Sequence, residues 1–252
     1  MEELEYAIMR YIPSLVSGES INLAALFYYK PTSYRELYII ENWDRVAAFD
    51  DTLNIRMIKD ILLDLRDEVG TVLTNPAFDI KRVCAKYCNE LHFDSIISLE
   101  TGSDELSRQI EDVKRMYFQF ELEKEKRPKK DEQKQFLSRI LKSKEIEYRR
   151  DDHQVGKYKE QIIYDYTFGN YGVKFFNFDL DTIRSQTINK VKAWAWNCTN
   201  SIDGRKVIIF YSAPDEQKPD VLALVSMLRD TAYKVVNINE GIRGQILDDL
   251  IS

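Results

Sequence analysis

An acidic residue and a lysine on two adjacent predicted strands form the first chemical pattern in this sequence. Asp165 ends the apolar segment QIIYD, and the next segment carries Lys174 in the run GVK. Two carboxylates on neighbouring strands can hold Mg²⁺, and a lysine beside them can steady a phosphate or an attacking water. Gly172 stands where the second acid is expected, so Glu160 or Asp179 would have to supply it. The pattern offers one function, a metal-dependent nuclease that uses Glu160, Asp165 and Lys174.

The order of elements in the C-terminal half resembles, in outline, the core of the restriction-nuclease-like fold. The patterns predict two strands, a helix, a strand, a helix, a strand and a closing helix. The resemblance implies an inactive relative, because one carboxylate rarely holds a catalytic Mg²⁺ alone. Mg²⁺ is therefore expected only under the nuclease alternative, and the sequence otherwise implies no cofactor.

Aromatic side chains crowd the same predicted hairpin and the helix after it. Tyr166 and Tyr171 flank Lys174 in sequence, and Trp196 cannot share a helix face with Trp194, since two residues turn a helix by about 200°. Aromatics beside lysines can stack on single-stranded nucleic acid, but exposed Tyr and Trp are also typical of protein interfaces. We predict that Tyr166, Tyr171, Lys174 and Trp196 contact another protein, with single-stranded nucleic acid as the alternative.

A polar group interrupts the apolar N-terminal third of the chain. Gly18, Glu19 and Asn22 lie in the run GESIN between two predicted strands, and Arg10 lies on the first of these strands. A charge in a half-buried sheet is stable only when it is paired and hydrogen-bonded. We predict a cluster of Arg10, Glu19 and Asn22 that fixes the turn and the strand register. A small recognition site at the sheet edge is the other interpretation.

The order and spacing of these residues resemble the start of a bacterial domain-of-unknown-function family, number thirty thirty-seven. Its members begin with Y-A-x-x-R-Y-x-P, a short spacer and G-E-x-x-N before an apolar run, and this chain has Tyr6, Arg10, Pro13, Glu19 and Asn22 at those positions. Where members have N-V-G-V, this chain has NLAA. The resemblance covers about the first third of the chain. It implies no activity, but members in mobile elements and beside kinase-like toxin genes imply a partner or accessory role.

Three residues that bind metals elsewhere follow one another at intervals of four in a predicted helix: Cys84, Cys88 and His92. Three such positions span about 12 Å of helix axis, which is too long for one tetrahedral metal site. We therefore predict no metal site and expect both cysteines to be small buried side chains on one helix face. Three cysteines also form no disulfide framework, which favours a reducing, cytoplasmic location.

The composition excludes several classes of protein. The 252 residues are 44% hydrophobic and 31% charged, with a net charge of -6, so the chain can build cores and has no strongly basic field for nucleic acid. With 9 glycines, the sequence has no Gly-rich phosphate-binding loop. No apolar run approaches the length of a membrane helix, so we expect no membrane partner.

The hydrophobic patterns predict an α+β protein in three segments. Residues 1–120 contain three apolar strand patterns and then helical patterns, which predicts an antiparallel sheet with helices. Residues 121–154 are dense in both charges and contain Pro128, which predicts a charged helical linker. Residues 155–252 alternate strand and helix patterns, and the fully apolar run KVIIFYSA is typical of a strand buried on both faces. This segment is predicted to be an α/β domain with a mixed sheet.

Together these patterns predict a noncatalytic protein-binding or regulatory protein. Two folded domains carry many aromatic residues and no complete catalytic set. The family resemblance implies a phage-defence, anti-defence or toxin–antitoxin type system as the setting. The metal-dependent nuclease and a single-stranded nucleic-acid-binding module are the alternatives.

Overall fold

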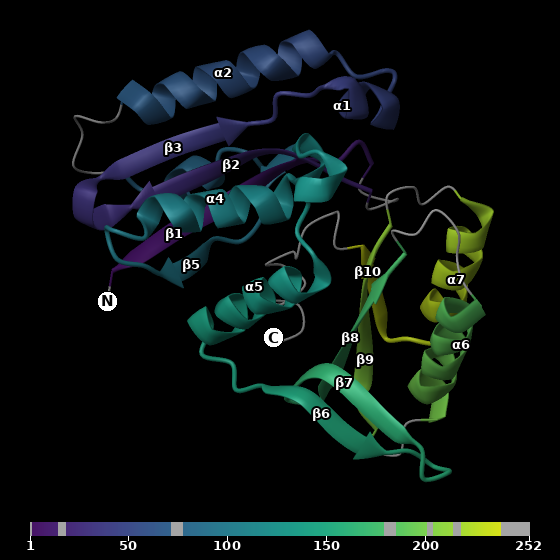
Figure 1. Ribbon diagram of the computed structural model, residues 1–252. Helices are drawn as coiled ribbons and strands as arrows, with labels where there is room; N and C mark the ends of the chain where they lie inside the picture. The colour runs from purple at the N-terminus through teal and green to yellow at the C-terminus, as the bar shows by residue number, and fades with distance from the viewer. Residues whose placement is uncertain are drawn as a thin grey trace. The chain divides into compact units, whose positions relative to one another are not determined.

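The computed structural model describes residues 2–14, 19–71, 78–178, 185–200, 204–213 and 218–237. The described chain divides into two compact units, one that reaches Ser143 and one that begins at Lys144. Each unit combines a β-sheet with helices (Figure 1). The sheet of the first unit is antiparallel and that of the second is mixed, which confirms the predicted α+β class.

Five antiparallel strands form the sheet of the first unit. They are β1 (Glu3–Tyr11), β2 (Ile21–Tyr29), β3 (Tyr34–Ile39), β4 (Leu91–Phe93) and β5 (Ile97–Glu100). The first three make the predicted meander, and β4 and β5 pair with successive parts of β1. The sequence patterns do not reveal β4, because this strand is only three residues long.

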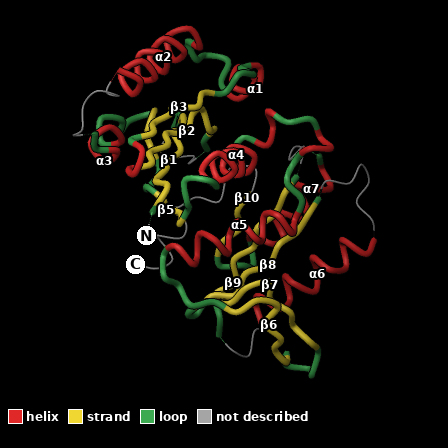
Figure 2. The backbone as a smooth tube through the Cα atoms, turned by 60° about the vertical axis from the view of Figure 1, so that its left-hand side comes forward, coloured by secondary structure: helices red, strands yellow, loops and turns green. Residues whose placement is uncertain are grey.

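Two amphipathic helices cover this sheet, α2 (Ile55–Thr71) and α4 (Leu106–Tyr117). Figures 1 and 2 show them on opposite sides of the strands. Asn54 caps α2, since its Oδ1 accepts a hydrogen bond from the Met57 amide at 3.1 Å. The helix then buries a stripe at helical spacing: Ile58, Leu62, Leu65 and Val69. Two shorter helices, α1 (Asp44–Phe49) and α3 (Ile80–Cys84), complete this part.

The charge-rich segment 121–154 contributes regular elements to both units. Short 3-10 turns at Gln119–Glu121 and Lys124–Lys126 lead into α5 (Lys130–Ser143), and β6 (Arg149–Val155) follows. α5 packs on β5 within the first unit. Its apolar stripe is fully buried: Phe136, Leu137, Ile140 and Leu141. The abundance of charges in the sequence hides this stripe, because lysines and acids surround it on the exposed helix face.

The sheet of the second unit has the order β10-β9-β8-β7-β6. After β6 come β7 (Gln161–Phe168), β8 (Tyr171–Asn177), β9 (Lys206–Ser212) and β10 (Lys234–Asn237). β6, β7 and β8 are antiparallel neighbours, and β9 is parallel to β8 and β10. The predicted hairpin turns at Gly169, whose φ of 49° favours glycine. The predicted closing helix lies outside the described residues.

Two helices cover one face of this second sheet, α6 (Ser185–Asn200) and α7 (Pro219–Arg229). The core beneath them includes Tyr164 from β7, Ile209 from β9, Trp194 from α6 and Leu224 from α7. Pro219 begins α7, as the sequence pattern predicts. Among helices in the described ranges, none is both long and apolar enough to cross a membrane.

The helix predicted to carry both Cys84 and Cys88 is shorter than expected. α3 ends at Cys84, and Cys88 instead forms an isolated antiparallel bridge with His92. The pairing of β4 with β1 draws the chain out of the helix at this point. Cys84 is partly buried and Cys88 is exposed, so the expectation of two buried cysteines on one helix face was wrong.

Candidate functional site

Arg10 lies in the interior of the first sheet and forms a buried ion pair with Asp94. The Arg10 Nε and Asp94 Oδ2 atoms are 2.6 Å apart, and the two side chains are only 2% and 4% exposed. Arg10 Nη1 also donates to Ser20 Oγ at 3.4 Å. Asp94 occupies the gap between β4 and β5, where its amide donates to the Ile8 carbonyl. A buried guanidinium requires such an acid, because an unpaired charge would be costly away from water.

A bulge in β2 places Asn22 beside Arg10. The register passes from Met9 opposite Ala24 to Arg10 opposite Asn22, so Leu23 is the extra residue. Residues directly opposite each other present their side chains on the same face of a sheet. Asn22 Nδ2 donates to the Tyr117 carbonyl at the end of α4, at 3.0 Å. The structure thus brings together two members of the predicted cluster.

The third member of that cluster, Glu19, lies at the edge of the described residues. Glu19 is exposed, whereas the acid at 2.6 Å from Arg10 is Asp94. Gly18 lies outside the described residues. Sequence reasoning missed Asp94, and its one signal was a single acid in the otherwise apolar run LHFDSII.

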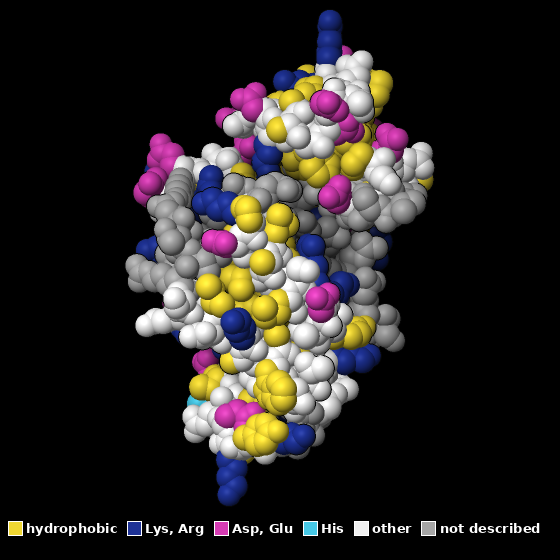
Figure 3. All heavy atoms as spheres, turned by 90° about the vertical axis from the view of Figure 1, so that its right-hand side faces the viewer, with side chains coloured by type: hydrophobic (Ala, Val, Ile, Leu, Met, Phe, Trp, Pro, Cys, Tyr) yellow, Lys and Arg dark blue, Asp and Glu magenta, His cyan; other side chains and the backbone are white. Residues whose placement is uncertain are grey.

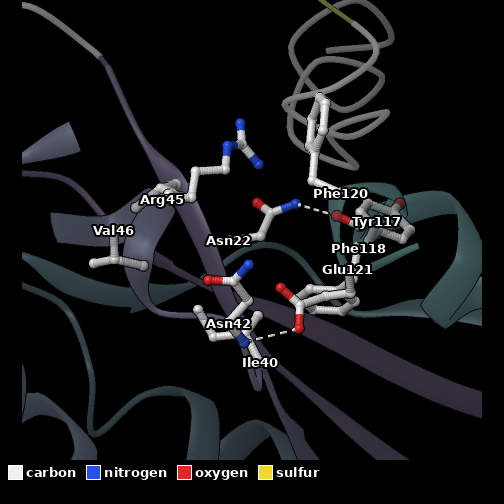
Figure 4. Close-up of a pocket in the computed structure, with 10 residues that line it drawn as sticks. Asn22, Ile40, Asn42, Arg45, Val46, Tyr117, Phe118, Phe120 and Glu121 are labelled. Carbon is white, nitrogen blue, oxygen red and sulfur yellow. Dashed lines mark hydrogen bonds between the residues drawn. The ribbon is translucent and has the colours of Figure 1, made fainter. Parts of the chain in front are cut away.

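Figure 4 shows the small hollow beside Asn22. Glu121 Oε2 accepts the Asn42 amide at 3.1 Å, and the Arg45 guanidinium lies 4.0 Å from the Phe120 ring centre. Asn22 Oδ1 is buried and receives no hydrogen bond from the described protein atoms. The hollow offers about 20 Å³, which is room for one water molecule. A water molecule in this hollow can therefore complete the hydrogen bonds of Asn22, but the hollow is too small for a substrate.

Asp165 and Lys174 lie together in the second sheet, where they join two strands. The paired register of β7 and β8 runs from Phe168–Tyr171 to Tyr166–Val173 and stops before Asp165. Beyond that point Asp165 Oδ2 accepts the Phe175 amide at 2.8 Å, and Lys174 Nζ donates to the Ile163 carbonyl at 2.8 Å. The two charged groups are 3.5 Å apart. These side chains thus replace backbone hydrogen bonds where the ladder is interrupted.

The other nuclease positions do not join this pair. A Cβ atom on Gly172 would come within 2.4 Å of the Tyr164 ring, so the backbone has no room for an acid there. Glu160 binds the β6–β7 turn, where its Oε2 accepts the Tyr158 amide at 2.7 Å. Five residues of extended chain, about 16 Å, separate Glu160 from Asp165. Asp179 lies outside the described residues, and the described part contains no group of three metal-ligating side chains.

The predicted binding aromatics differ in exposure. Tyr166 is 1% exposed and packs between the Tyr148 and Phe175 rings, which places it in a core rather than on a surface. Tyr171 is half-buried against Tyr233. The Lys174 side chain is 18% exposed and lies over the Trp194 ring. Trp194 is buried while Trp196 is exposed, which confirms that the two tryptophans occupy different helix faces.

Trp196 forms an exposed aromatic pair with Tyr158 of the β6–β7 turn. The ring centres are 6.3 Å apart and the planes are stacked at 27°. Trp196 is 48% exposed and Tyr158 is 68% exposed. Figure 3 shows hydrophobic side chains at the lower end of the face that it draws, with both acidic and basic side chains beside them. Tyr158 is one of the aromatic residues of the predicted hairpin and lies between two lysines, but it was not among the four residues predicted to bind.

The partly buried thiols of Cys84 and Cys198 are poorly suited to nucleophilic chemistry. Burial raises the pKa of Cys84 to about 12 and that of Cys198 to about 12. The thiolate is the reactive form, so both side chains remain protonated near neutral pH. Neither thiol is therefore a candidate nucleophile.

Residues 6–84 match the model of a family described as "Protein of unknown function (DUF3037)". This match confirms the resemblance drawn from the N-terminal motif, for that part of the chain. Arg10 and Asn22 lie inside the matched range, and Asp94 lies beyond its end. A search of curated proteins and a search of solved structures each gave no match.

Proposed function

We propose that this chain is a noncatalytic protein-binding or regulatory protein. The observation that supports the proposal is the exposed, stacked pair of Tyr158 and Trp196. Exposed aromatic side chains supply large contact areas and are enriched among the residues that dominate protein interfaces. Because each ring already restricts the other, binding would cost little further side-chain entropy.

Basic side chains near this pair favour an acidic partner surface. Lys157 Nζ lies 5.9 Å from the Tyr158 ring centre, and Lys192 is exposed one helical turn before Trp196. Glu160, an acid beside Tyr158, accepts the Tyr158 amide. The α6 sequence, SQTINKVKAWAWNCTN, contains no acidic residue. Complementary acidic groups on a partner would steer the encounter and fix its orientation. The family resemblance adds the setting, and we propose a phage-defence, anti-defence or toxin–antitoxin type system.

Affinity purification from the host that carries the gene tests this proposal. We expect a stoichiometric protein partner with the wild-type chain and its loss with the Tyr158→Ala, Trp196→Ala double variant. Leu222→Ala is the matched control, because Leu222 is 46% exposed on the neighbouring helix α7. Equal recovery of the partner with wild type and double variant would contradict the assignment to this surface. Binding of an oligonucleotide that weakens steeply with salt would instead support the nucleic-acid alternative.

The second candidate is the metal-dependent nuclease, and the observation in its favour is the proximity of Asp165 and Lys174. The hydrogen bonds that both side chains make to the strand backbone favour a structural role over this one. Asp165→Asn separates the two roles, since it keeps an acceptor for the Phe175 amide and removes the charge that binds Mg²⁺. Cleavage of DNA or RNA with Mg²⁺ or Mn²⁺ that the wild type performs and a folded Asp165→Asn variant lacks would establish the nuclease.

A further inference from the structure

The outer edge of β3 borders an open groove in the first unit. β3 is an edge strand of the described sheet, paired only with β2. The groove has a volume of about 570 Å³ and lies between residues 36–41 on one side and three α2 side chains, Lys59, Leu63 and Arg66, on the other. Because six consecutive residues line it, four of β3 and the two that follow, the groove runs along the strand backbone rather than around a single side chain.

The backbone of β3 offers hydrogen bonds toward this groove. The Ile40 amide donates to the Leu23 carbonyl of β2 at 3.0 Å, so the backbone polar groups of Ile40 point toward β2 and away from the free edge. Neighbouring residues of a strand direct their amides and carbonyls to opposite edges, and Leu37 and Ile39 therefore direct theirs outward. An edge of this kind is a template on which another extended segment can pair.

The α2 wall of the groove is cationic around an apolar centre. Leu63 is 40% exposed, and Lys59 and Arg66 flank it along the helix. Lys59 Nζ lies over the Trp43 ring, 5.0 Å from its centre, which holds the charge at the mouth of the groove. The α2 residues that line the groove include no acid.

The acids on the other side of the groove offset this charge only in part. Glu36 Oε1 is 2.9 Å from Lys114 Nζ, and Glu36 also accepts the Tyr34 hydroxyl. Lys114 does not line the groove, so Glu36 has a cationic partner outside it, and Glu41 at the end of the strand stands against both Lys59 and Arg66. The α2 wall therefore favours an acidic segment.

We propose that the β3 edge and α2 bind an extended acidic segment of a partner protein by strand addition. Lys59 and Arg66 are seven residues apart, about 10 Å along the helix axis. Alternate side chains of an extended strand lie about 7 Å apart, so residues i and i+4 lie about 13 Å apart. The bound segment of the partner thus carries acids at positions i and i+4, one for Lys59 and one for Arg66. The apolar residue between them, at i+2, contacts Leu63. This site lies in the first unit and is independent of the proposed role of Tyr158 and Trp196.

A fluorescently labelled heptapeptide, Thr-Asp-Thr-Val-Thr-Asp-Thr with blocked ends, provides the probe for an anisotropy titration. We expect binding to the full chain at least about tenfold tighter than that of the same peptide with lysine in place of aspartate. The Lys59→Glu, Arg66→Glu double variant should reverse this preference. Arg56→Glu is the control, because Arg56 is exposed on α2 outside the groove and should leave the preference unchanged.

Backbone pairing has its own test. Two versions of the peptide carry N-methyl groups on alternate amides, one on the odd and one on the even positions. We expect one version to lose binding by at least about tenfold and the other to bind as before, since only alternate amides face β3. Circular dichroism and thermal melts confirm that each protein variant is folded, and Trp196→Ala should bind the peptide as wild type does.

Several results would overturn the proposal. They are absence of binding at peptide concentrations up to ~1 mM, equal affinity for the acidic and basic peptides, and equal tolerance of both methylated versions. Sedimentation of the wild-type chain as a dimer that Lys59→Glu, Arg66→Glu dissociates would identify a second copy as the occupant instead. Loss of peptide binding in a folded Trp196→Ala variant would assign the contact to the aromatic pair.

Discussion

Each of the two sheets contains a pair of opposite charges at a point where the β ladder is broken. In the first sheet Arg10 meets Asp94 in the gap between β4 and β5, at 2.6 Å. In the second sheet Asp165 and Lys174 stand at 3.5 Å where β7 and β8 cease to pair. Both pairs attracted functional interpretations in the sequence. In the second sheet the charged groups also satisfy backbone groups that the interruption leaves open.

The two pairs differ in how the chain builds them. Arg10 and Asp94 are 84 residues apart and nearly fully buried, so each charge depends on its partner. Asp165 and Lys174 lie on consecutive strands, and each has a backbone partner besides the other. Where the ion pair itself is the main compensation for burying two charges, substitution of either residue should be strongly destabilising. Where backbone hydrogen bonds share that role, substitution should destabilise the protein less. The following predictions test that difference.

Asp94→Ala is expected to have the largest effect. It leaves the Arg10 guanidinium buried without its acid and should lower the free energy of unfolding by about 3–5 kcal/mol. Urea denaturation followed by circular dichroism measures the change. Glu19→Ala is the matched acid-to-alanine control, and an exposed side chain of this kind should cost less than about 1 kcal/mol. If Glu19→Ala costs as much as Asp94→Ala, the predicted Arg10–Glu19 cluster governs stability after all.

Asp165→Ala should cost about 2–3 kcal/mol, less than Asp94→Ala. It removes the acceptor of the Phe175 amide and leaves Lys174 without its acid, but Lys174 can still donate to the Ile163 carbonyl. Asp165→Asn retains an acceptor and should cost about half as much. The same denaturation assay measures both. Equal losses for the two variants would mean that the charge, rather than the hydrogen bond, stabilises the sheet.

Gly172→Ala should cost about 2 kcal/mol, because its Cβ would meet the Tyr164 ring at 2.4 Å. Thermal melts report the loss. Gly70→Ala is the control, since nothing lies within 4 Å of a Cβ at that helical position. Alanine is a better helix former than glycine, so Gly70→Ala should be neutral or slightly stabilising. A wild-type melting temperature for Gly172→Ala would show that the Tyr164 ring yields and that an acid could be placed there.

Thr167→Val should have the smallest effect, about 1 kcal/mol at pH 7. Burial acts to raise the pKa of Asp152, but hydrogen bonds from Thr167 and Gln154 outweigh it and hold that pKa below 3.8. The stabilisation of the ionised form is therefore present near neutral pH and is lost as the pH falls through the folded-state pKa. Urea denaturation at pH 7 and below pH 3.8 should show the difference between variant and wild type shrink in acid. A difference independent of pH would assign the effect to packing.

The sequence predicts the fold where a pattern is local. The run KVIIFYSA indicates the central strand β9, and the helical spacing of apolar residues from Ile58 onward indicates α2. α5 was harder to recognise, because its buried stripe lies among charges that occupy the exposed face. β4 depends on pairing with β1 rather than on its own three residues, and such tertiary contacts leave little trace in a short segment.

The candidate sites were harder to predict than the fold. Arg10 and Asn22 lie opposite each other only because the β2 bulge shifts the register, and Asp94 comes from 84 residues downstream. Asp165 and Lys174 do converge as their strand positions suggest, but whether they are free to act depends on the break in the β7–β8 ladder. Trp196 lies at the surface and Tyr166 is buried, and residue type alone could not predict this difference.

The bulge at Leu23 adds one residue to β2, which interrupts the alternation of side chains between the two faces of the sheet. Residues before and after it alternate out of step, so Asn22 shares the face of Arg10 and Ile21 is buried on the opposite one. Deleting Leu23 would bring the two halves back into step and leave Asn22 opposite Arg10 in a regular ladder. Deleting a residue far from the bulge would instead move part of β2 by one position and turn its side chains to the other face. The bulge is therefore the place in β2 where the loss of one residue should be tolerated best.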